Sequence, residues 1–101
     1  MNLHDASLEI IRQGQAPRGA YIASPAFSQY GYCWLRDGAW TAYGMDCAGQ
    51  HDSARAFYQW VGRTLCGQEA RLDRLLGALA AGETPAETDY LPTRFTLDGG
   101  E

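Results

Sequence analysis

The fold of this chain is decided by the stretch DGAWTAYGMDCA, residues 37–48, in which few side chains are polar. Asp37 at its start is a good helix N-cap, and Gly49 directly follows its end, where glycine is common. The sequence therefore predicts a helix that begins at Asp37 and is apolar on almost every side. A helix without a solvent-facing side is buried among other elements. The small residues that would let neighbouring helices approach it closely are Gly38, Ala42 and Gly44.

A second helix is predicted over residues 53–66, with Asp52 as its cap. Only a short link separates it from the first helix, so the two are expected to form an antiparallel αα-hairpin. Polar side chains flank its apolar stripe, which is typical of an outer, half-exposed helix. The stripe consists of Ala56, Phe57, Trp60, Val61 and Leu65.

Three shorter elements are predicted on either side of this hairpin. Residues 5–13 suit a helix capped by Asp5. A later amphipathic helix extends to about Ala81, and its leucine stripe is expected to be core rather than a partner-binding surface. Residues 93–97 then alternate as in a strand, and Asp98-Gly99-Gly100 is a hairpin-type turn signal. The leucine stripe consists of Leu72, Leu75, Leu76 and Leu79.

Length, charge and composition exclude several classes of function. A chain of 101 residues fits one small domain, and 46% apolar with 20% charged residues is typical of a globular protein. A net charge of −4 disfavours nucleic acid as a partner, since phosphate binding needs clustered cations. Residues 1–12 lack the apolar core of a secretory signal, and no stretch approaches the ~20 apolar residues that span a membrane.

The three cysteines, Cys33, Cys47 and Cys66, match neither a metal motif nor a disulfide framework. Buried thiols in a reducing compartment are the default for such a set, so we expect a cytoplasmic protein. His4 and His51 stand alone in the sequence and are expected on the surface. No metal site and no cofactor are predicted.

The segment that carries chemistry is Tyr30-Gly31-Tyr32-Cys33-Trp34-Leu35-Arg36-Asp37. Sugars have apolar C–H faces that stack on aromatic rings, and hydroxyls that need both donors and acceptors. Arginine offers donors only and ionised aspartate acceptors only, so together they can hold two adjacent hydroxyls. A sugar site is one interpretation. In the other, Asp37 caps the helix, Arg36 pairs with a carboxylate, and the aromatic residues belong to the core.

The same segment resembles glycoside hydrolase family 15, the glucoamylase-like family, in which a Tyr-x-Trp-x-Arg-Asp stretch leads into an inner helix. Further pieces are similar to the family in the same order, so the resemblance covers nearly the whole chain. Ser28-Gln29 departs from the family's more usual Pro-Asp at that place. The further pieces are residues 19–25, Ala48-Gly49 with Ala54, Phe57 and Trp60, and residues 91–95 with Leu97-Asp98-Gly99.

The resemblance implies an all-α fold, the first helices of an (α/α)6 barrel or six-hairpin toroid, with a short β-hairpin near the C-terminus. It implies an inverting, exo-acting α-glucosidase that releases glucose from non-reducing ends. It implies that Tyr30, Trp34, Arg36 and Asp37 bind the terminal glucose. The substrates it implies are α-linked glucosides: maltodextrin, isomalto-oligosaccharide or trehalose.

Inversion needs an acid and a base carboxyl roughly 6.5–9.5 Å apart. The resemblance implies two glutamates further along the chain, and Glu83, Glu87 and Glu101 match neither, so we assign no catalytic residue. A strand and a turn without a return strand also indicate truncation. We therefore expect residues 1–101 to be the N-terminal portion of the catalytic domain, incomplete and inactive alone, with the rest of that domain as partner. The alternatives are a non-catalytic helical-repeat scaffold, although no second copy recurs, and a carbohydrate-binding protein without hydrolysis.

Overall fold

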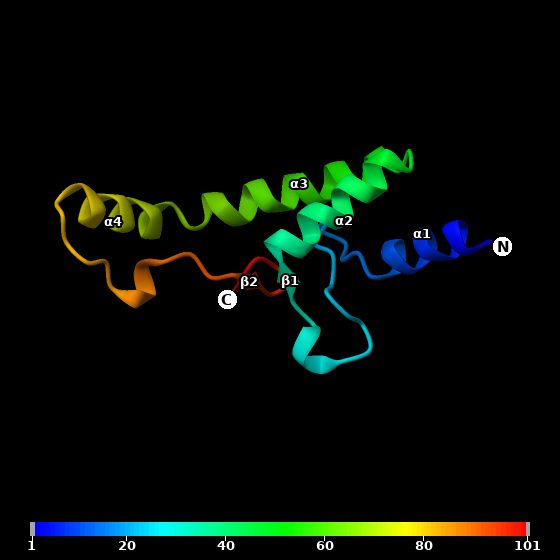
Figure 1. Cartoon of the computed structure of the whole chain (residues 1–101), viewed down its shortest axis with the longest axis horizontal. Coiled ribbons are helices and arrows are strands. Elements are labelled where there is room, and N and C mark those ends of the chain that lie inside the picture. The colour runs from blue at the N-terminus through cyan, green and yellow to red at the C-terminus, as the bar shows by residue number, and fades with distance from the viewer. Residues whose placement is uncertain (1, 101) are drawn as a thin grey trace.

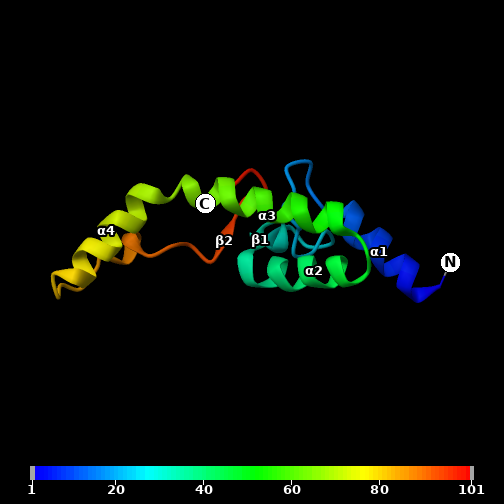
Figure 2. The same cartoon turned by 90° about the horizontal axis from the view of Figure 1, so that it is seen from above.

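The computed structural model describes residues 2–100, and over that range the chain is mostly helical (Figure 1). The helices are α1 (Leu3–Gln13), α2 (Leu35–Cys47), α3 (His51–Cys66) and α4 (Glu69–Ala80). Two 3₁₀ turns, η1 (Ser28–Tyr30) and η2 (Glu87–Asp89), and two short strands, β1 (Cys33–Trp34) and β2 (Arg94–Phe95), complete the described elements. The molecule is elongated, 57 × 27 × 20 Å, with α1 and α4 at opposite ends (Figure 2).

Helices α2 and α3 form the antiparallel αα-hairpin that the sequence predicts, and they lie side by side in both views (Figures 1 and 2). The connection turns at Gly49, whose φ of +82° lies in the left-handed region that favours glycine. Close approach depends on Gly38, because a Cβ there would lie 2.5 Å from the ring of Phe57. Ala42 is fully buried on the same face, whereas a Cβ at Gly44 would meet nothing within 4 Å. The prediction of close packing is confirmed at Gly38 and Ala42 and is wrong at Gly44.

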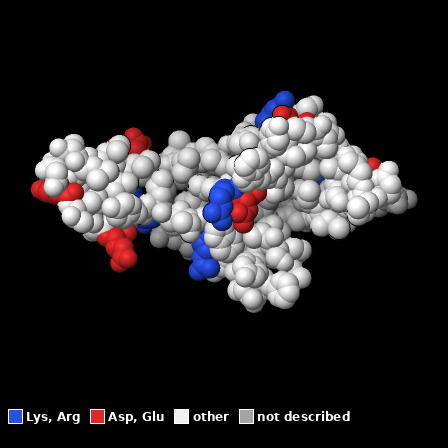
Figure 3. Space-filling view, viewed as in Figure 1, with Lys and Arg blue, Asp and Glu red and all other residues white. Residues whose placement is uncertain are grey.

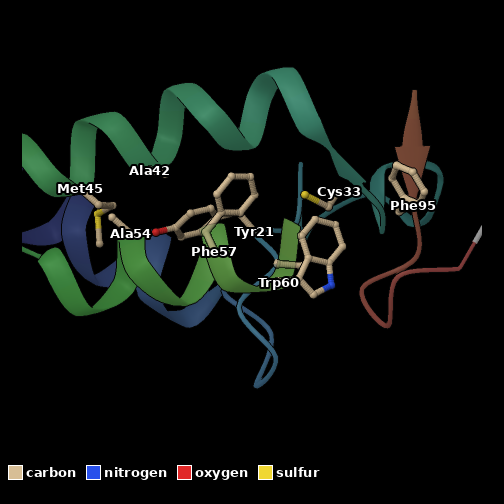
Figure 4. Packing of buried hydrophobic residues seen from close by; sticks show 9 residues of the cluster. Tyr21, Cys33, Ala42, Met45, Ala54, Phe57, Trp60 and Phe95 are labelled. Carbon is tan, nitrogen blue, oxygen red and sulfur yellow. The ribbon is translucent and has the colours of Figure 1, made fainter. Parts of the chain in front are cut away.

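The core lies between the α2–α3 hairpin and the segments that flank it (Figure 4). Trp60 and Phe57 of α3 are its largest fully buried side chains, and both belong to the predicted stripe of that helix. Tyr21 stacks on Phe57 with 5.2 Å between ring centroids, and Phe95 of β2 meets Trp60 edge-on at 6.4 Å. The hydroxyl of Tyr21 is hydrogen-bonded to that of Ser53 at 2.7 Å, so its burial leaves no polar atom unsatisfied. Aromatic burial on this scale dominates the energetics of a small core.

A small two-stranded antiparallel sheet is present, but it is not the hairpin expected near the C-terminus, because its strands are far apart in the sequence. β2 pairs with β1, with Cys33 opposite Phe95 and Trp34 opposite Arg94. The turn predicted at residues 98–100 also forms, since the amide of Thr96 donates to the carbonyl of Gly100 at 2.8 Å. Alternation in the sequence indicates which side chains face the core, but it does not specify the partner strand.

Helix α2 begins earlier than predicted, at Leu35. The reason is that Trp34, the last residue of β1, keeps an extended backbone and occupies the N-cap position itself. Asp37 therefore does not cap the helix and lies in its first turn, where a negative charge is favourable beside the positive end of the helix dipole. The strand thus runs directly into the helix, with no loop between them.

Helices α1 and α3 also begin earlier than predicted. α1 begins at Leu3, because the side chain of Asn2 accepts a hydrogen bond from the amide of Asp5 at 2.8 Å. α3 begins at His51, and Asp52 lies in its first turn. In both helices the aspartate expected as the cap is therefore already helical.

Apolar surface that the sequence predicts to be buried is exposed on α2 and α4. On α2, Trp40 is 72% exposed and Tyr43 62%, since only the face toward α3 is covered within residues 2–100. On α4, Leu76 is 60% exposed and Leu79 54%, and no residue of the helix is fully buried. Figure 3 shows broad uncharged surface between small groups of charged side chains. The predictions of an all-round buried α2 and a core stripe on α4 are therefore wrong for the described residues.

Of the three cysteines, Cys33 is buried as predicted, whereas Cys47 and Cys66 are exposed. Cys47 is the last residue of α2, and Cys66 is the last residue of α3. Within residues 2–100 no helix is both long enough and apolar enough to cross a bilayer.

Candidate functional site

Residues 30–37 run from η1 through β1 into the first turn of α2. Backbone hydrogen bonds hold one edge of this segment: the amide of Ala23 donates to the carbonyl of Tyr32 at 3.0 Å, and that of Ser24 to Tyr30 at 3.2 Å. Strand β2 holds the other edge through its pairing with β1. The segment is aperiodic in sequence but is fixed on both sides.

The aromatic side chains of the segment form a connected group. The ring centroids of Tyr30 and Trp34 are 6.1 Å apart at an interplanar angle of 51°, and those of Tyr32 and Trp34 are 6.1 Å apart at 85°. Phe27 meets Tyr30 edge-on at 6.3 Å. Tyr30 is 46% exposed and Trp34 is half-buried, so ring surface remains accessible to a ligand. The interpretation of these rings as core is therefore wrong for Tyr30 and Trp34.

Arg36 and Asp37 lie together on the first turn of α2. The Nε of Arg36 is 3.5 Å from the Oδ1 of Asp37, and both side chains are exposed. At that separation and exposure the ion pair contributes little to stability. A guanidinium and a carboxylate that are not engaged by the core are free to bind polar groups of a ligand.

A cavity of about 410 Å³ lies beside these residues. Its lining consists of Trp34, Leu35 and Arg36 together with Pro92 and Thr93, which precede β2. This volume falls within the range of small-molecule sites. Two of the four predicted residues, Trp34 and Arg36, thus line one cavity.

The other two predicted residues, Tyr30 and Asp37, reach this cavity only through their neighbours. Tyr30 contacts the ring of Trp34, and Asp37 contacts the guanidinium of Arg36. All four lie on one continuous patch, although Tyr30 and Asp37 are not part of the cavity lining.

Sequence reasoning missed Arg94 as a member of this site. Its guanidinium carbon lies 4.3 Å from the centroid of the Tyr32 ring and 5.9 Å from that of Trp34. The alternating pattern of residues 93–97 predicts the strand that carries Arg94 but not its position beside Trp34. No local signal in the sequence could have supplied that pairing.

Cys33 anchors the segment on the core side. Its side chain is fully buried, and burial raises the pKa of its thiol from 9.0 to about 11. A thiol with such a pKa is a poor nucleophile near neutral pH, because the reactive form is the thiolate. Cys33 therefore has a packing role in this site.

The remaining ionisable residues give no second centre in the described part of the chain. His4 lies beside Asp5, and His51 is hydrogen-bonded to Asp46, all of them exposed. Among residues 2–100 no three potential ligands are grouped as a metal ion would need. Glu83 and Glu87 are exposed and do not line the cavity, and Glu101 lies outside the described residues.

Comparison with known proteins agrees with these features. The sequence profile of glycosyl hydrolases family 15 matches residues 4–80. An isomaltose glucohydrolase from Kribbella flavida is 45% identical over 93 residues, which are 91% of this chain and 24% of that protein. The chain therefore belongs to family 15 of the glycosyl hydrolases, as its resemblance predicts.

Solved structures are similar over the full length of the chain. A wild-type glycosidase and a glycosidase variant in complex with glucose each superpose with a TM-score of 0.89 at 40% identity. The match covers 100% of this chain and 30% of each of those chains. This chain thus spans about a quarter to a third of the length of these relatives, and its predicted mainly helical fold class is confirmed.

Proposed function

We propose that this chain supplies the glucose-binding part of the active site of an inverting, exo-acting α-glucosidase. Such an enzyme hydrolyses α-glucosidic bonds and releases glucose from non-reducing ends. The observation that carries the proposal is the patch beside the 410 Å³ cavity, where the accessible rings of Tyr30 and Trp34 adjoin the exposed Arg36 and Asp37.

The chemistry of this patch suits a pyranose ring. Trp34 offers an aromatic surface to the apolar C–H face of the sugar, and Tyr30 extends that surface. Arg36 can donate to hydroxyl oxygens while Asp37 accepts from hydroxyl hydrogens, and hydrogen bonds to charged groups contribute about 1.5–3 kcal/mol each. An apolar face and paired polar groups beside the same cavity are the features that distinguish a sugar site from the site of a purely apolar ligand.

We propose a non-reducing α-1,6-linked glucose, as in isomaltose or longer isomalto-oligosaccharides, as the substrate. The name of the Kribbella relative supports isomaltose, and the glycosidase structure in complex with glucose supports glucose as the bound unit. Maltodextrin and trehalose share the same terminal glucose and are the competing substrates. Hydrolysis of a panel of isomaltose, maltose and trehalose distinguishes them.

The acid and base of the reaction are proposed to lie in the rest of the catalytic domain, of which residues 1–101 would be the N-terminal portion. An inverting enzyme keeps its two carboxyls roughly 6.5–9.5 Å apart around the sugar, and the acid needs surroundings that raise its pKa. Glu83 and Glu87 are exposed and lie away from the cavity lining, which suits neither role. The chain's partner would thus be the remainder of its own domain.

A cytoplasmic location is part of the proposal. Its support is the set of free thiols, two of which are exposed at Cys47 and Cys66. Exposed thiols persist in reducing compartments, whereas oxidising ones favour disulfides.

The test of the proposed function is Asp37→Ala in the protein that joins this chain to the remainder of its catalytic domain. Loss of two charge-assisted hydrogen bonds to the sugar should lower kcat/KM for isomaltose by about 100-fold or more. Asp73→Ala is the matched control, because Asp73 is an exposed carboxylate on α4 outside the patch. Turnover equal to that of the control would remove Asp37 from the glucose site.

Two further measurements separate the parts of the proposal. NMR of the first product should show β-glucose released from the α-linked substrate, and α-glucose would contradict inversion. Binding of isomaltose without any turnover by the joined protein would favour the carbohydrate-binding alternative.

A further inference from the structure

Arg94 lies against the two aromatic rings that connect β1 to the proposed glucose site. Its guanidinium carbon is 4.3 Å from the Tyr32 centroid and 5.9 Å from the Trp34 centroid, both within the distance of a cation–π contact. The two rings stand at 85° to each other. One cation therefore contacts two rings whose faces point in different directions.

The sheet fixes Arg94 in this place. The register sets Trp34 opposite Arg94 and Cys33 opposite Phe95. Successive side chains of a strand point to opposite faces, so the buried residues Cys33 and Phe95 share the core face, while Trp34 and Arg94 share the outer one. Phe95 is fully buried and meets Trp60 edge-on, which anchors β2 in the core. The core contacts of Cys33 and Phe95 thus hold Trp34 and Arg94 in place on the outer face.

The contacts of Trp34 show how Arg94 acts on the site. Trp34 lines the 410 Å³ cavity, whereas Tyr32 and Arg94 are not part of the lining. Tyr32 meets the Trp34 ring at 6.1 Å, and Arg94 contacts both. A change at Arg94 would therefore reach a ligand in the cavity through the orientation of Trp34.

We infer that Arg94 is a positioning residue that holds Trp34 in the orientation that receives the sugar, an inference that rests on the proposed function. The planar guanidinium suits this role, because it stacks on aromatic faces in a way that the ammonium group of lysine does not. No part of the sequence resemblance assigns Arg94 this function.

Fluorine NMR of the protein that joins this chain to the remainder of its catalytic domain, labelled with fluorotryptophan, tests the inference. The resonances of Trp34, Trp40 and Trp60 are assigned with the variants Trp34→Phe, Trp40→Phe and Trp60→Phe. Arg94→Gln should shift or broaden the Trp34 resonance and leave that of Trp60 unchanged. Arg94→Lys should restore the Trp34 resonance in part. Arg55→Gln, on the exposed side of α3, is the matched control and should move none of them.

Titration with glucose, followed on the Trp34 resonance, gives the second measurement. Loss of the two cation–π contacts should weaken glucose binding by about threefold to tenfold in Arg94→Gln, with an intermediate effect in Arg94→Lys. Affinity and a Trp34 resonance equal to those of Arg55→Gln would overturn the inference. So would a shifted Trp60 resonance, because Arg94 would then support the fold as a whole. A shifted Trp34 resonance with no response to glucose in any variant would overturn the proposed function and leave Arg94 as the group that orients Trp34.

Discussion

The variant Gly38→Ala tests the close packing of α2 against α3, which holds the proposed site against the core. A Cβ at Gly38 would lie 2.5 and 2.6 Å from two ring carbons of Phe57 and 3.4 Å from the Sγ of Cys33. Phe57 has little room to move away, since it is 1% exposed and stacks on Tyr21 at 5.2 Å. Tyr21 is in turn held by its hydrogen bond to Ser53. The substitution must therefore separate α2 from α3 or force a side chain off its preferred rotamer.

The magnitude follows from two opposing effects. Overpacking of a close-packed core costs about 1–3 kcal/mol. Replacing glycine by alanine within a helix returns at most about 1 kcal/mol. The net effect of Gly38→Ala is thus a destabilisation of the α2–α3 hairpin by about 1–2 kcal/mol. Gly44→Ala is the matched control on the same helix, because its Cβ would meet nothing within 4 Å, and it should stabilise the hairpin by about 0.5–1 kcal/mol.

Hydrogen exchange measured by mass spectrometry reports this difference peptide by peptide. Exchange of α2 and α3 amides should become about 5- to 30-fold faster in Gly38→Ala and about two- to fivefold slower in Gly44→Ala. Equal protection of α2 in the two variants would refute the conclusion that Gly38 is required for close packing against Phe57.

Three further predictions concern exposed and buried side chains. The uncovered apolar face of α2 should make the chain bind hydrophobic dyes and self-associate, because Trp40 on this face is 72% exposed. Trp40→Gln should reduce both effects, as measured by dye fluorescence and light scattering. Unchanged self-association in this variant would assign the association to another surface. At about pH 8 an alkylating reagent should modify Cys47 and Cys66 much faster than Cys33, whose pKa of about 11 keeps it protonated. Modification of all three thiols at one rate would contradict the burial of Cys33. Because burial raises the Cys33 pKa above its unfolded value of 9.0, the free energy of unfolding should fall as pH rises from 9.0 to about 11. A Cys33→Ala variant should lack this pH dependence.

The hairpin was predictable from sequence because its signals are local. The apolar run of α2, the short link and the Phe57–Trp60 stripe of α3 lie within a single stretch of chain, and the structure confirms the two helices and their packing against each other. The helix starts were less predictable, since an aspartate is equally suited to the cap and to the first turn. At the start of α2, Trp34 has an extended backbone and takes the N-cap position, so Asp37 lies in the first turn.

The parts that sequence reasoning missed depend on contacts between distant residues. The pairing of β2 with β1, and with it the position of Arg94 against Tyr32, joins residues about sixty positions apart. The exposed surfaces on α2 and α4 have a different cause. A hydrophobic pattern indicates that a face will be covered, but it does not indicate which segment covers it. Trp40 and Leu76 are thus apolar by sequence and exposed within residues 2–100.

Three of the four proposed site residues, Trp34, Arg36 and Asp37, lie between two anchors that meet in the core. Cys33 and Gly38 are both buried, and a Cβ on Gly38 would lie 3.4 Å from the sulfur of Cys33. Between them the chain passes from strand to helix and exposes Arg36 and Asp37. Because the two anchors are adjacent in space, the segment between them has no freedom to shift along the core. The position of the backbone that carries Trp34, Arg36 and Asp37 therefore depends on packing against Phe57, a residue that has no part in the cavity lining.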